Sequence, residues 1–142
     1  DLSRTATKGS VEVEELCKIY TFKQVHQMIS TVVSQVEITT SPVEILKTTF
    51  PMGSMTGAPK ISAMQIIEKL EETKRGLYSG AVGYFTPEGD FDFNVVIRSI
   101  LYNAENQYLS FSVGSAITFE ATPEGEYEEC LLKAKAMFEV LK

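Results

Sequence analysis

The chain has 142 residues, 44% of them hydrophobic and 23% charged, which is enough for one globular domain with a sizeable core. Its formal net charge of −6 excludes a typical nucleic-acid-binding protein, because phosphate contacts require clustered Lys and Arg, and no apolar run reaches the length of a membrane span or marks a secretory signal. Cys17 and Cys130 lie far apart, in neither a metal-binding nor a redox spacing, so we expect two reduced thiols in a cytoplasmic protein.

Two strands and a short helix are predicted in the first part of the chain. Val11 and Val13 alternate with acidic residues and predict a short strand, and the β-branched and aromatic residues from Tyr20 to Val36 predict a longer one. His26 lies inside this second segment, where a lone His is more often a half-buried structural residue than a ligand. Ser41, followed by Pro, begins the predicted helix.

A loop broken by glycines leads directly into a helix between Phe50 and Leu70, in the sequence FPMGSMTGAPKISAMQIIEKL. Gly53 and Gly57 allow backbone dihedrals that are closed to other residues, and Pro59 can occupy a first helical turn. The apolar residues that follow with helical spacing, and that predict a buried stripe, are Ala63, Ile66, Ile67 and Leu70. The loop therefore brings backbone N–H groups to the N-terminus of an amphipathic helix that is anchored in a core.

Two interpretations of this loop remain open on chemistry alone. The first is an anion site, in which Ser54, Thr56 and Lys60 join the positive end of the helix dipole to bind a carboxylate or a phosphate. The second is a well-capped helix start that binds nothing. A Walker-type phosphate loop is excluded, because Ala58 and Pro59 stand where that motif requires Gly and Lys.

A hairpin is predicted next. Residues Gly80–Phe85 predict a strand, the Pro-Glu-Gly-Asp sequence at 87–90 predicts a turn, and Phe91–Leu101 predict a second strand. The side chains on one face of this second strand are expected to be Phe93, Val95, Ile97 and Leu101, and those on the other face Asn94, Val96, Arg98 and Ile100. Arg98 is the informative residue, since a guanidinium among apolar side chains must reach solvent, form an internal salt bridge or bind an anion.

A third strand and a loop of small residues follow. Residues Gln107–Val113 predict the strand, with Leu109, Phe111 and Val113 pointing inward, and Gly114–Thr118 form the loop. The order of strands, helix and further strands predicts an α+β fold rather than a parallel βαβ array.

The last predicted element is a helix that starts after Pro123 and continues to Lys142. Its first turn is rich in acidic residues, which the helix dipole favours without any ligand. Glu126 and Glu129, however, are three residues apart on one face, and Lys133 follows Glu129 at i+4. Two carboxylates on one face are also the hard oxygen ligands that an octahedral Mg²⁺ site recruits.

Four sequence blocks occur in the same order as in one known family. They are FPMGSMTGAPK, RGLYSGAVGYF, NVVIRSI and PEGEYEECLLKAKAM, and together they resemble the C-terminal portion of the chorismate-utilising enzymes. Within that family they are most similar to the aminodeoxychorismate synthase component I branch, the para-aminobenzoate synthase large subunits. The resemblance implies that residues 1–142 are the C-terminal part of a single chorismate-binding domain, with antiparallel sheets layered with outer helices. The opening run from Asp1 to Arg4 resembles an interior Asp-Leu-x-Arg segment of the family, so we interpret the chain as a fragment.

The resemblance also implies roles for individual residues. It assigns Arg98, with help from Tyr84, to the enolpyruvyl carboxylate of chorismate, a task that suits the planar guanidinium. It places His26, in the segment from Val25 to Ser30, at the ring end of the substrate. An imidazole there can hydrogen-bond the departing hydroxyl or its replacement.

Further substrate and metal contacts are implied in three other segments. The loop of small residues is expected to offer backbone N–H groups to a substrate carboxylate, although Ala116 stands where many family members carry a second Gly. Glu129 is expected to bind Mg²⁺, with Glu126 in its inner or water-mediated shell and Lys133 beside it. The remaining residues expected to bind substrate are Ser54, Thr56, Gly57, Gly114, Ala116 and Lys133.

The implied reaction transfers ammonia, supplied by a glutamine amidotransferase partner, to chorismate and gives 4-amino-4-deoxychorismate, a precursor of para-aminobenzoate and folate. The resemblance places the expected nucleophilic Lys upstream of Asp1, so we expect the chain alone to be inactive. Two alternatives remain open: an anthranilate synthase component I or isochorismate synthase, and a noncatalytic α+β interaction domain that shares only the scaffold. Self-association through exposed sheet edges is a further expectation for a fragment.

Overall fold

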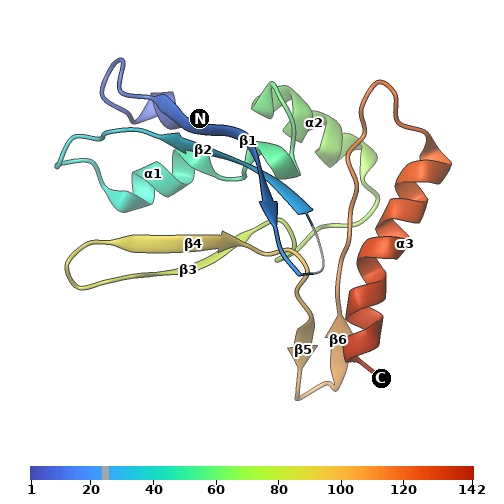
Figure 1. The fold of residues 1–142 in the computed structure, drawn as a ribbon. Coiled ribbons are helices and arrows are strands. Elements are labelled where there is room, and N and C mark those ends of the chain that lie inside the picture. The colour runs from blue at the N-terminus through green and yellow to red at the C-terminus, as the bar shows by residue number, and fades with distance from the viewer. Residues whose placement is uncertain (24–25) are drawn as a thin grey trace. The chain divides into compact units, whose positions relative to one another are not determined.

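The computed structural model describes residues 1–23 and 26–142, which divide into two compact units, Asp1–Met52 and Gly53–Lys142 (Figure 1). The described strands form three two-stranded antiparallel sheets, and these occur together with helices. The predicted α+β fold is therefore confirmed, whereas the assignment of residues 1–142 to a single chorismate-binding domain stays a prediction. None of the helices in the described part of the chain is both long and apolar enough to cross a membrane.

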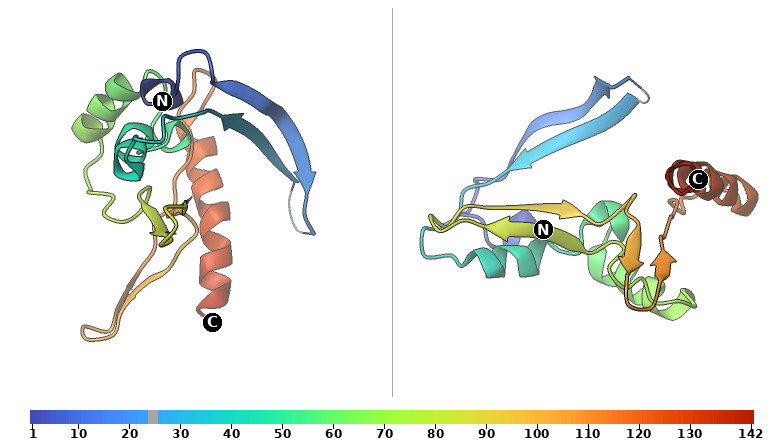
Figure 2. Two further views of the ribbon diagram at one scale, coloured as in Figure 1. Left: turned by 90° about the vertical axis from the view of Figure 1, so that its left-hand side faces the viewer. Right: turned by 90° about the horizontal axis from the view of Figure 1, so that it is seen from below.

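The first unit contains a long antiparallel hairpin and a short helix. Its elements are the 3₁₀ helix η1 (Leu2–Arg4), β1 (Glu12–Thr21), β2 (His26–Val33) and α1 (Pro42–Thr49). The two strands form the curved ribbon seen in Figure 2, with Thr21 opposite His26 at one end. Helix α1 begins after Ser41, as predicted, and Pro42 occupies its first turn, where a missing N–H costs no helical hydrogen bond.

The chain reversal between β1 and β2 corrects the predicted strands. A short strand at 11–13 followed by a single strand over Tyr20–Val36 is wrong, because β1 runs for ten residues and ends at Thr21. Val25, in the segment to which the resemblance assigns a role, lies outside the described residues. Residues 21–26 contain no Gly, Pro, Asn or Asp, so composition carries no turn signal at the reversal.

The second unit carries the loop and helix on which the functional predictions concentrate. Its elements are the 3₁₀ helix η2 (Gly53–Met55), α2 (Lys60–Leu70), β3 (Ala81–Phe85), β4 (Phe91–Val95), β5 (Leu101–Asn103), β6 (Tyr108–Ser110) and α3 (Pro123–Val140). β3 and β4 form the predicted hairpin, in which Ala81 lies opposite Val95. Helix α2 begins directly after Pro59, so the predicted passage from a glycine-broken loop into a helix is confirmed.

The single strand predicted from Phe91 to Leu101 is wrong, because β4 ends where its partner β3 begins. Beyond that point Val96 bonds to the turn before β3: its carbonyl accepts from the Ser79 N–H at 3.0 Å, and its N–H donates to the Gly80 carbonyl at 3.0 Å. Arg98 has a φ of 50°, in the left-handed region. The predicted alternation of two faces therefore stops before Arg98.

The third predicted strand is shorter than expected. β6 pairs three residues with β5, and the partner strand is itself only three residues long, so pairing cannot extend to Val113. Leu109 is 38% exposed rather than inward. Phe111 and Val113 are half-buried, but they lie in the loop beyond the strand.

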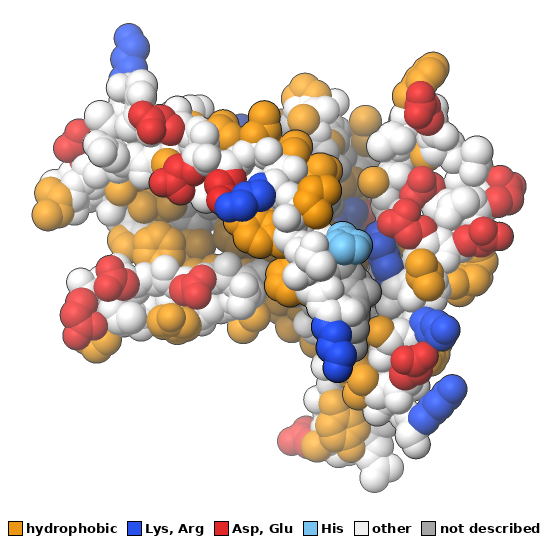
Figure 3. All heavy atoms as spheres, in the orientation of Figure 1, with side chains coloured by type: hydrophobic (Ala, Val, Ile, Leu, Met, Phe, Trp, Pro, Cys, Tyr) orange, Lys and Arg blue, Asp and Glu red, His pale blue; other side chains and the backbone are white. Residues whose placement is uncertain are grey.

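Large apolar side chains stay exposed on both units. Among the described residues only Val96 and Ala134 are buried apolar side chains, so the sizeable core that the length allows is not formed by them. The predicted burial of the stripe on α2 is wrong, because Ile66 is 55% exposed and Leu70 is 69% exposed. Figure 3 shows the hydrophobic side chains at the surface. Two-stranded sheets and separate helices have too little area to cover one another's apolar faces.

Candidate functional site

A pocket of about 550 Å³ is formed by residues that lie far apart in the sequence of the second unit. Its walls come from η2, the segment after α2, the residues after β4, the loop after β6 and helix α3. The residues with a predicted substrate-binding role that line it are Ser54, Arg98, Gly114, Ala116 and Lys133. The structure therefore brings these five positions, predicted in separate motifs, to one cavity.

The pocket carries more cationic than anionic side chains. The cations are Lys74, Arg75, Arg98 and Lys133, and the anions are Glu71 and Glu72. Three of the cations are paired, in the ion pairs Lys74–Glu68, Arg75–Glu71 and Lys133–Glu129. Among the described residues no carboxylate forms an ion pair with Arg98, so these residues do not supply the internal salt bridge considered for it. A guanidinium that has no carboxylate partner can bind the carboxylate of a ligand.

Tyr78, rather than Tyr84, is the tyrosine that lines the pocket with Arg98. Tyr84 is 60% exposed and lies on β3 opposite Asp92, toward the hairpin turn, whereas Arg98 follows the other end of the hairpin. The rise of about 3.3 Å per residue separates Tyr84 from the pocket end of β3 by about 10 Å. The structure therefore does not place Tyr84 at the pocket. Tyr78 belongs to the same RGLYSGAVGYF block as Tyr84, and the sequence assigned no role to it.

The loop after β6 runs antiparallel to α3, as Figure 1 shows. The rings of Phe111 and Phe138 meet edge to face with their centroids 5.2 Å apart. Nearer the start of the helix, Lys133 Nζ donates a hydrogen bond to the Gly114 carbonyl at 2.9 Å. These contacts hold the loop against α3, so Gly114 and Lys133 reach the pocket together.

Glu126 and Glu129 both bond to the hydroxyl of Ser115, which lines the pocket. Glu129 also forms an ion pair with Lys133 at 2.5 Å. The pKa of Glu129 is lowered mainly by the hydrogen bond from Lys133 and next by the hydrogen bond from Ser115. This carboxylate is therefore ionised near neutral pH. The two carboxylates predicted from the sequence are therefore close together at the edge of the pocket.

Glu126 and Glu129 are the two carboxylates that the described residues could offer to a metal ion at the edge of the pocket. Within residues 1–23 and 26–142 there is no group of three or more His, Cys, Asp and Glu side chains that could hold a metal ion. Mg²⁺ is commonly bound by one or two carboxylates and completes its octahedron with water and substrate oxygens. Glu126 and Glu129 fit this pattern by their chemistry, and their role as ligands stays a prediction.

The loop before α2 contributes less to the pocket than expected. Ser54 is part of the lining, whereas Thr56 and Gly57 are not. Thr56 donates its N–H to the Gly53 carbonyl at 3.2 Å. Gly57 has a φ of 138°, and a Cβ there would lie 3.1 Å from the Cβ of Ala63. Gly57 thus lets the loop pack closely against the first turn of α2, and a substrate contact for Thr56 or Gly57 stays a prediction.

His26 is the first residue of β2, and its side chain is exposed rather than half-buried. Its Nδ1 lies 3.0 Å from Oγ1 of Thr21, the residue directly opposite in the hairpin. This cross-strand contact orients the imidazole within the first unit. The catalytic role that the resemblance implies for His26 stays a prediction.

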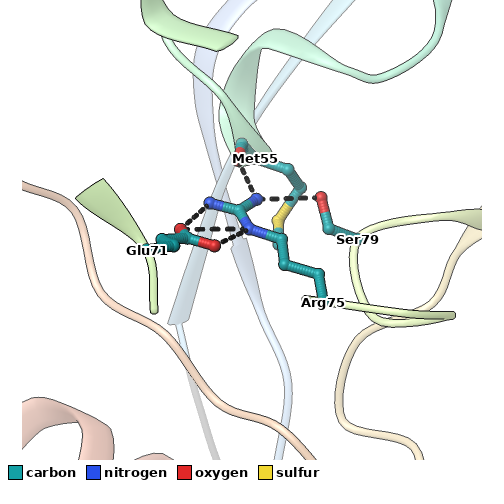
Figure 4. A network of polar contacts seen from close by, with 4 residues as sticks. All are labelled: Met55, Glu71, Arg75 and Ser79. Carbon is teal, nitrogen blue, oxygen red and sulfur yellow. Dashed lines mark hydrogen bonds and ion pairs between the residues drawn. The ribbon is translucent and has the colours of Figure 1, made fainter. Parts of the chain in front are cut away.

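Arg75 is a residue that sequence reasoning missed, and its guanidinium joins three parts of the second unit (Figure 4). Nε donates to the Glu71 carboxylate at 2.9 Å and Nη2 donates to it at 2.5 Å. Nη1 donates to the Met55 carbonyl at 2.7 Å and to the Ser79 hydroxyl at 3.2 Å. The available signal was the i, i+4 spacing of Glu71 and Arg75, which favours such a pair only on a helix surface.

The Glu71–Arg75 pair predicts a pH-dependent contribution to stability. Hydrogen bonds from Arg75 are the main cause that lowers the pKa of Glu71 from its ordinary value of 4.5. The stabilisation is therefore complete above pH 4.5 and is lost as the pH falls through the lowered folded-state pKa. Because Glu71 is 39% exposed, solvent screening limits the effect to less than about 1 kcal/mol. Urea unfolding should show that the free energy of unfolding falls less between pH 6 and pH 3 for Glu71→Gln than for the unaltered chain. The neighbouring Glu72→Gln should behave like the unaltered chain, and an equal change in both variants would contradict the assignment.

Comparison with known proteins identifies the family. Residues 1–139 match the family described as chorismate binding enzyme. The chain is 45% identical to the probable chloroplastic aminodeoxychorismate synthase of Oryza sativa subsp. japonica over 143 residues, which is 100% of this chain and 16% of the rice protein. It is 38% identical over 142 residues to anthranilate synthase component 1 of Aquifex aeolicus, covering 100% of this chain and 28% of that protein.

A solved structure gives the same result for the fold. The anthranilate synthase component I of Streptococcus pneumoniae TIGR4 superposes with a TM-score of 0.84 at 33% sequence identity, over 96% of this chain and 31% of that one. The chain thus spans less than one third of the length of each of these relatives. Since the match to the family extends over nearly the whole sequence, this chain belongs to the chorismate binding enzymes.

Proposed function

We propose that this chain forms one wall of the active site of an aminodeoxychorismate synthase, and that it is the C-terminal part of the chorismate-binding domain of a longer polypeptide, called the whole protein below. The whole protein would convert chorismate and ammonia to 4-amino-4-deoxychorismate, with the ammonia supplied by a glutamine amidotransferase. Support comes from the family match and from the 39–45% identity to four aminodeoxychorismate synthases of plants, a bacterium and a yeast.

The observation that carries the proposal is the cationic pocket in which Arg98 lacks a carboxylate partner among the described residues. Chorismate carries two carboxylates on a cyclohexadiene core, so a site for it requires positive charge at both ends. Arg98 would bind the enolpyruvyl carboxylate through its planar fork, and the Tyr78 hydroxyl would donate a further hydrogen bond. The ring carboxylate would then face the side of the pocket where Ser115 and Lys133 lie.

Glu126 and Glu129 would hold Mg²⁺ at that second side. When bound, the ion would balance the charge of the ring carboxylate and withdraw electron density from the ring, which assists loss of the ring hydroxyl. Lys133 would keep Glu129 ionised and oriented. As part of the same proposal, the whole protein would be cytoplasmic and would act together with a glutamine amidotransferase.

Anthranilate synthase is the second candidate. The chain is 38% identical to anthranilate synthase component 1 from Aquifex aeolicus and from Bacillus subtilis, only slightly less than to several aminodeoxychorismate synthases. The pocket described here would serve either reaction, because both begin with the same dicarboxylate. The identity of the product therefore decides between them.

The test is incubation of the whole protein with chorismate, ammonia and Mg²⁺, followed by chromatographic separation of the products. Formation of 4-amino-4-deoxychorismate supports the proposal, whereas anthranilate or isochorismate would assign the chain to another branch of the family. No consumption of chorismate, together with no Mg²⁺-dependent protection against heat, would favour a noncatalytic interaction domain. The 142-residue chain alone is expected to give no product.

The contact between Gly114 and Tyr78 yields a prediction about substrate affinity. A Cβ at Gly114 would lie 2.7 Å from the Tyr78 hydroxyl oxygen, too close for unstrained contact, so Gly114→Ala must displace the loop or the phenol. We expect the affinity of the whole protein for chorismate, measured by calorimetry, to fall about tenfold. Gly53→Ala is the matched control, since a Cβ at Gly53 meets nothing within 4 Å. Equal affinities of the two variants would show that the close approach of Tyr78 is irrelevant to binding.

A further inference from the structure

The side chain of Arg75 bonds to three other residues of the second unit, and Figure 4 shows its guanidinium between Glu71, Met55 and Ser79. Its side chain is only 26% exposed. Nε–H and one Nη2–H donate to Glu71, and the two Nη1–H groups donate to Met55 and Ser79. Four of the five guanidinium donors are therefore used within the chain, so little remains with which to bind a ligand directly.

The partners of Arg75 belong to different walls of the pocket. Met55 and Glu71 line it themselves, on η2 and directly after α2. Ser79 is 7% exposed, has a φ of 69°, and follows the lining residue Tyr78. A non-glycine residue in the left-handed region is held there by its surroundings.

Ser79 also bonds to the segment after β4 that leads to Arg98. Its N–H donates to the Val96 carbonyl at 3.0 Å, two residues before Arg98. The Arg75 guanidinium thus connects η2 with the turn that carries Tyr78 and, through Ser79, with the segment that follows β4. Lys could not replace it, because a single ammonium lacks the planar fork that bonds a carboxylate, a carbonyl and a hydroxyl at the same time.

We propose that Arg75 is a positioning residue, which sets the separation of Tyr78 and Arg98 for a dicarboxylate ligand without contacting that ligand. This inference rests on the proposed function, because the ligand is taken to be chorismate. Removal of Arg75 should therefore weaken substrate binding while leaving the groups that act on bound substrate in place. The signature is a raised KM with a nearly unchanged kcat.

The experiment compares Arg75→Ala, Arg75→Lys and Lys69→Ala in the whole protein. Lys69 is an exposed cation on α2 that does not line the pocket, so its variant controls for the loss of one positive charge. For Arg75→Ala we expect the KM for chorismate to rise about tenfold, as for the loss of hydrogen bonds to a charged group, with kcat within about twofold. Arg75→Lys should recover only part of this loss, and Lys69→Ala should match the unaltered protein. An unchanged KM in Arg75→Ala would overturn the inference, and so would a KM fully restored in Arg75→Lys. A fall in kcat together with the loss of a cooperative unfolding transition in Arg75→Ala would also overturn it, because the residue would then support the fold as a whole.

A second readout needs no substrate. Hydrogen exchange measured by mass spectrometry should be about tenfold faster at residues 78–80 in Arg75→Ala, because the Ser79 N–H bond to Val96 loses its support. Exchange there should be unchanged in Lys69→Ala. If the unaltered protein fails to act on chorismate, the proposed function is wrong, and the exchange measurement still decides whether Arg75 orders this turn. Unchanged exchange in Arg75→Ala would refute the positioning role in either case.

Discussion

Replacement of Arg98 by Gly is expected to weaken chorismate binding about 100-fold while leaving the fold as stable as before or more stable. Arg98 has a φ of 50°, where a side chain costs about 1 kcal/mol that Gly does not incur. The same substitution removes the one pocket cation without a carboxylate partner among the described residues. Loss of a bidentate, charge-assisted contact is worth about 3 kcal/mol, or about 100-fold in affinity. Calorimetric titration of the whole protein with chorismate, together with urea unfolding, would measure both effects.

Gln107→Gly separates the two effects of this substitution. Gln107 also has a φ of 50°, but it lies in the turn between β5 and β6 and does not line the pocket. We expect Gln107→Gly to raise the free energy of unfolding by the same amount as Arg98→Gly, which is no more than about 1 kcal/mol. Its affinity for chorismate should be unaltered. If Arg98→Gly retained full affinity, the assignment of Arg98 to the substrate carboxylate would be wrong. A large destabilisation of Arg98→Gly alone would show that the guanidinium supports the fold instead.

The second large effect is expected for Glu129→Gln. The amide has nearly the shape of the carboxylate but carries no charge, so both the ion pair with Lys133 and a hard ligand for Mg²⁺ are lost. Turnover of chorismate by the whole protein should fall at least about 100-fold, and added Mg²⁺ should no longer protect the chorismate complex against heat. Product formation at a series of Mg²⁺ concentrations would measure the loss.

Glu128→Gln is the matched control for this prediction. Glu128 precedes Glu129 on α3, is exposed and does not line the pocket. Glu128→Gln removes one negative charge from the same helix turn as Glu129→Gln, so both variants share any general effect on the helix dipole. Activity near that of the unaltered protein is expected for Glu128→Gln. Comparable losses in the two variants would remove the reason to place the metal at Glu129.

The predictable part of the fold was local. The passage into α2, the start of α1 and the β3–β4 hairpin followed from Pro, Gly and turn residues that fix backbone dihedrals within a few positions. The ends of β4 and β6 did not, because a strand stops where its partner stops, and the partner is set by pairing rather than by propensity. The reversal between β1 and β2 was missed for the related reason that its residues favour strands.

The site was predictable in its charged groups and less so in its supporting ones. Arg98 and Lys133 were accessible from the sequence because a cation among apolar residues, or four residues after a Glu, requires an explanation. Arg75 and Ser115 act through hydrogen bonds to residues more than ten positions away, which no local pattern encodes. Tyr84 was assigned from the resemblance of the RGLYSGAVGYF block, which holds two tyrosines, and only the folded chain shows that Tyr78 is the one that lines the pocket.

The confinement of the pocket lining to the Gly53–Lys142 unit has a practical consequence for ligand discovery. A polypeptide that starts at Gly53 retains every side chain of the pocket lining, including Arg75. A well-dispersed amide spectrum would show that such a shortened molecule keeps its fold, and each lining residue would then report separately. Weak carboxylate compounds could then be ranked by which wall they perturb, without enzymatic turnover.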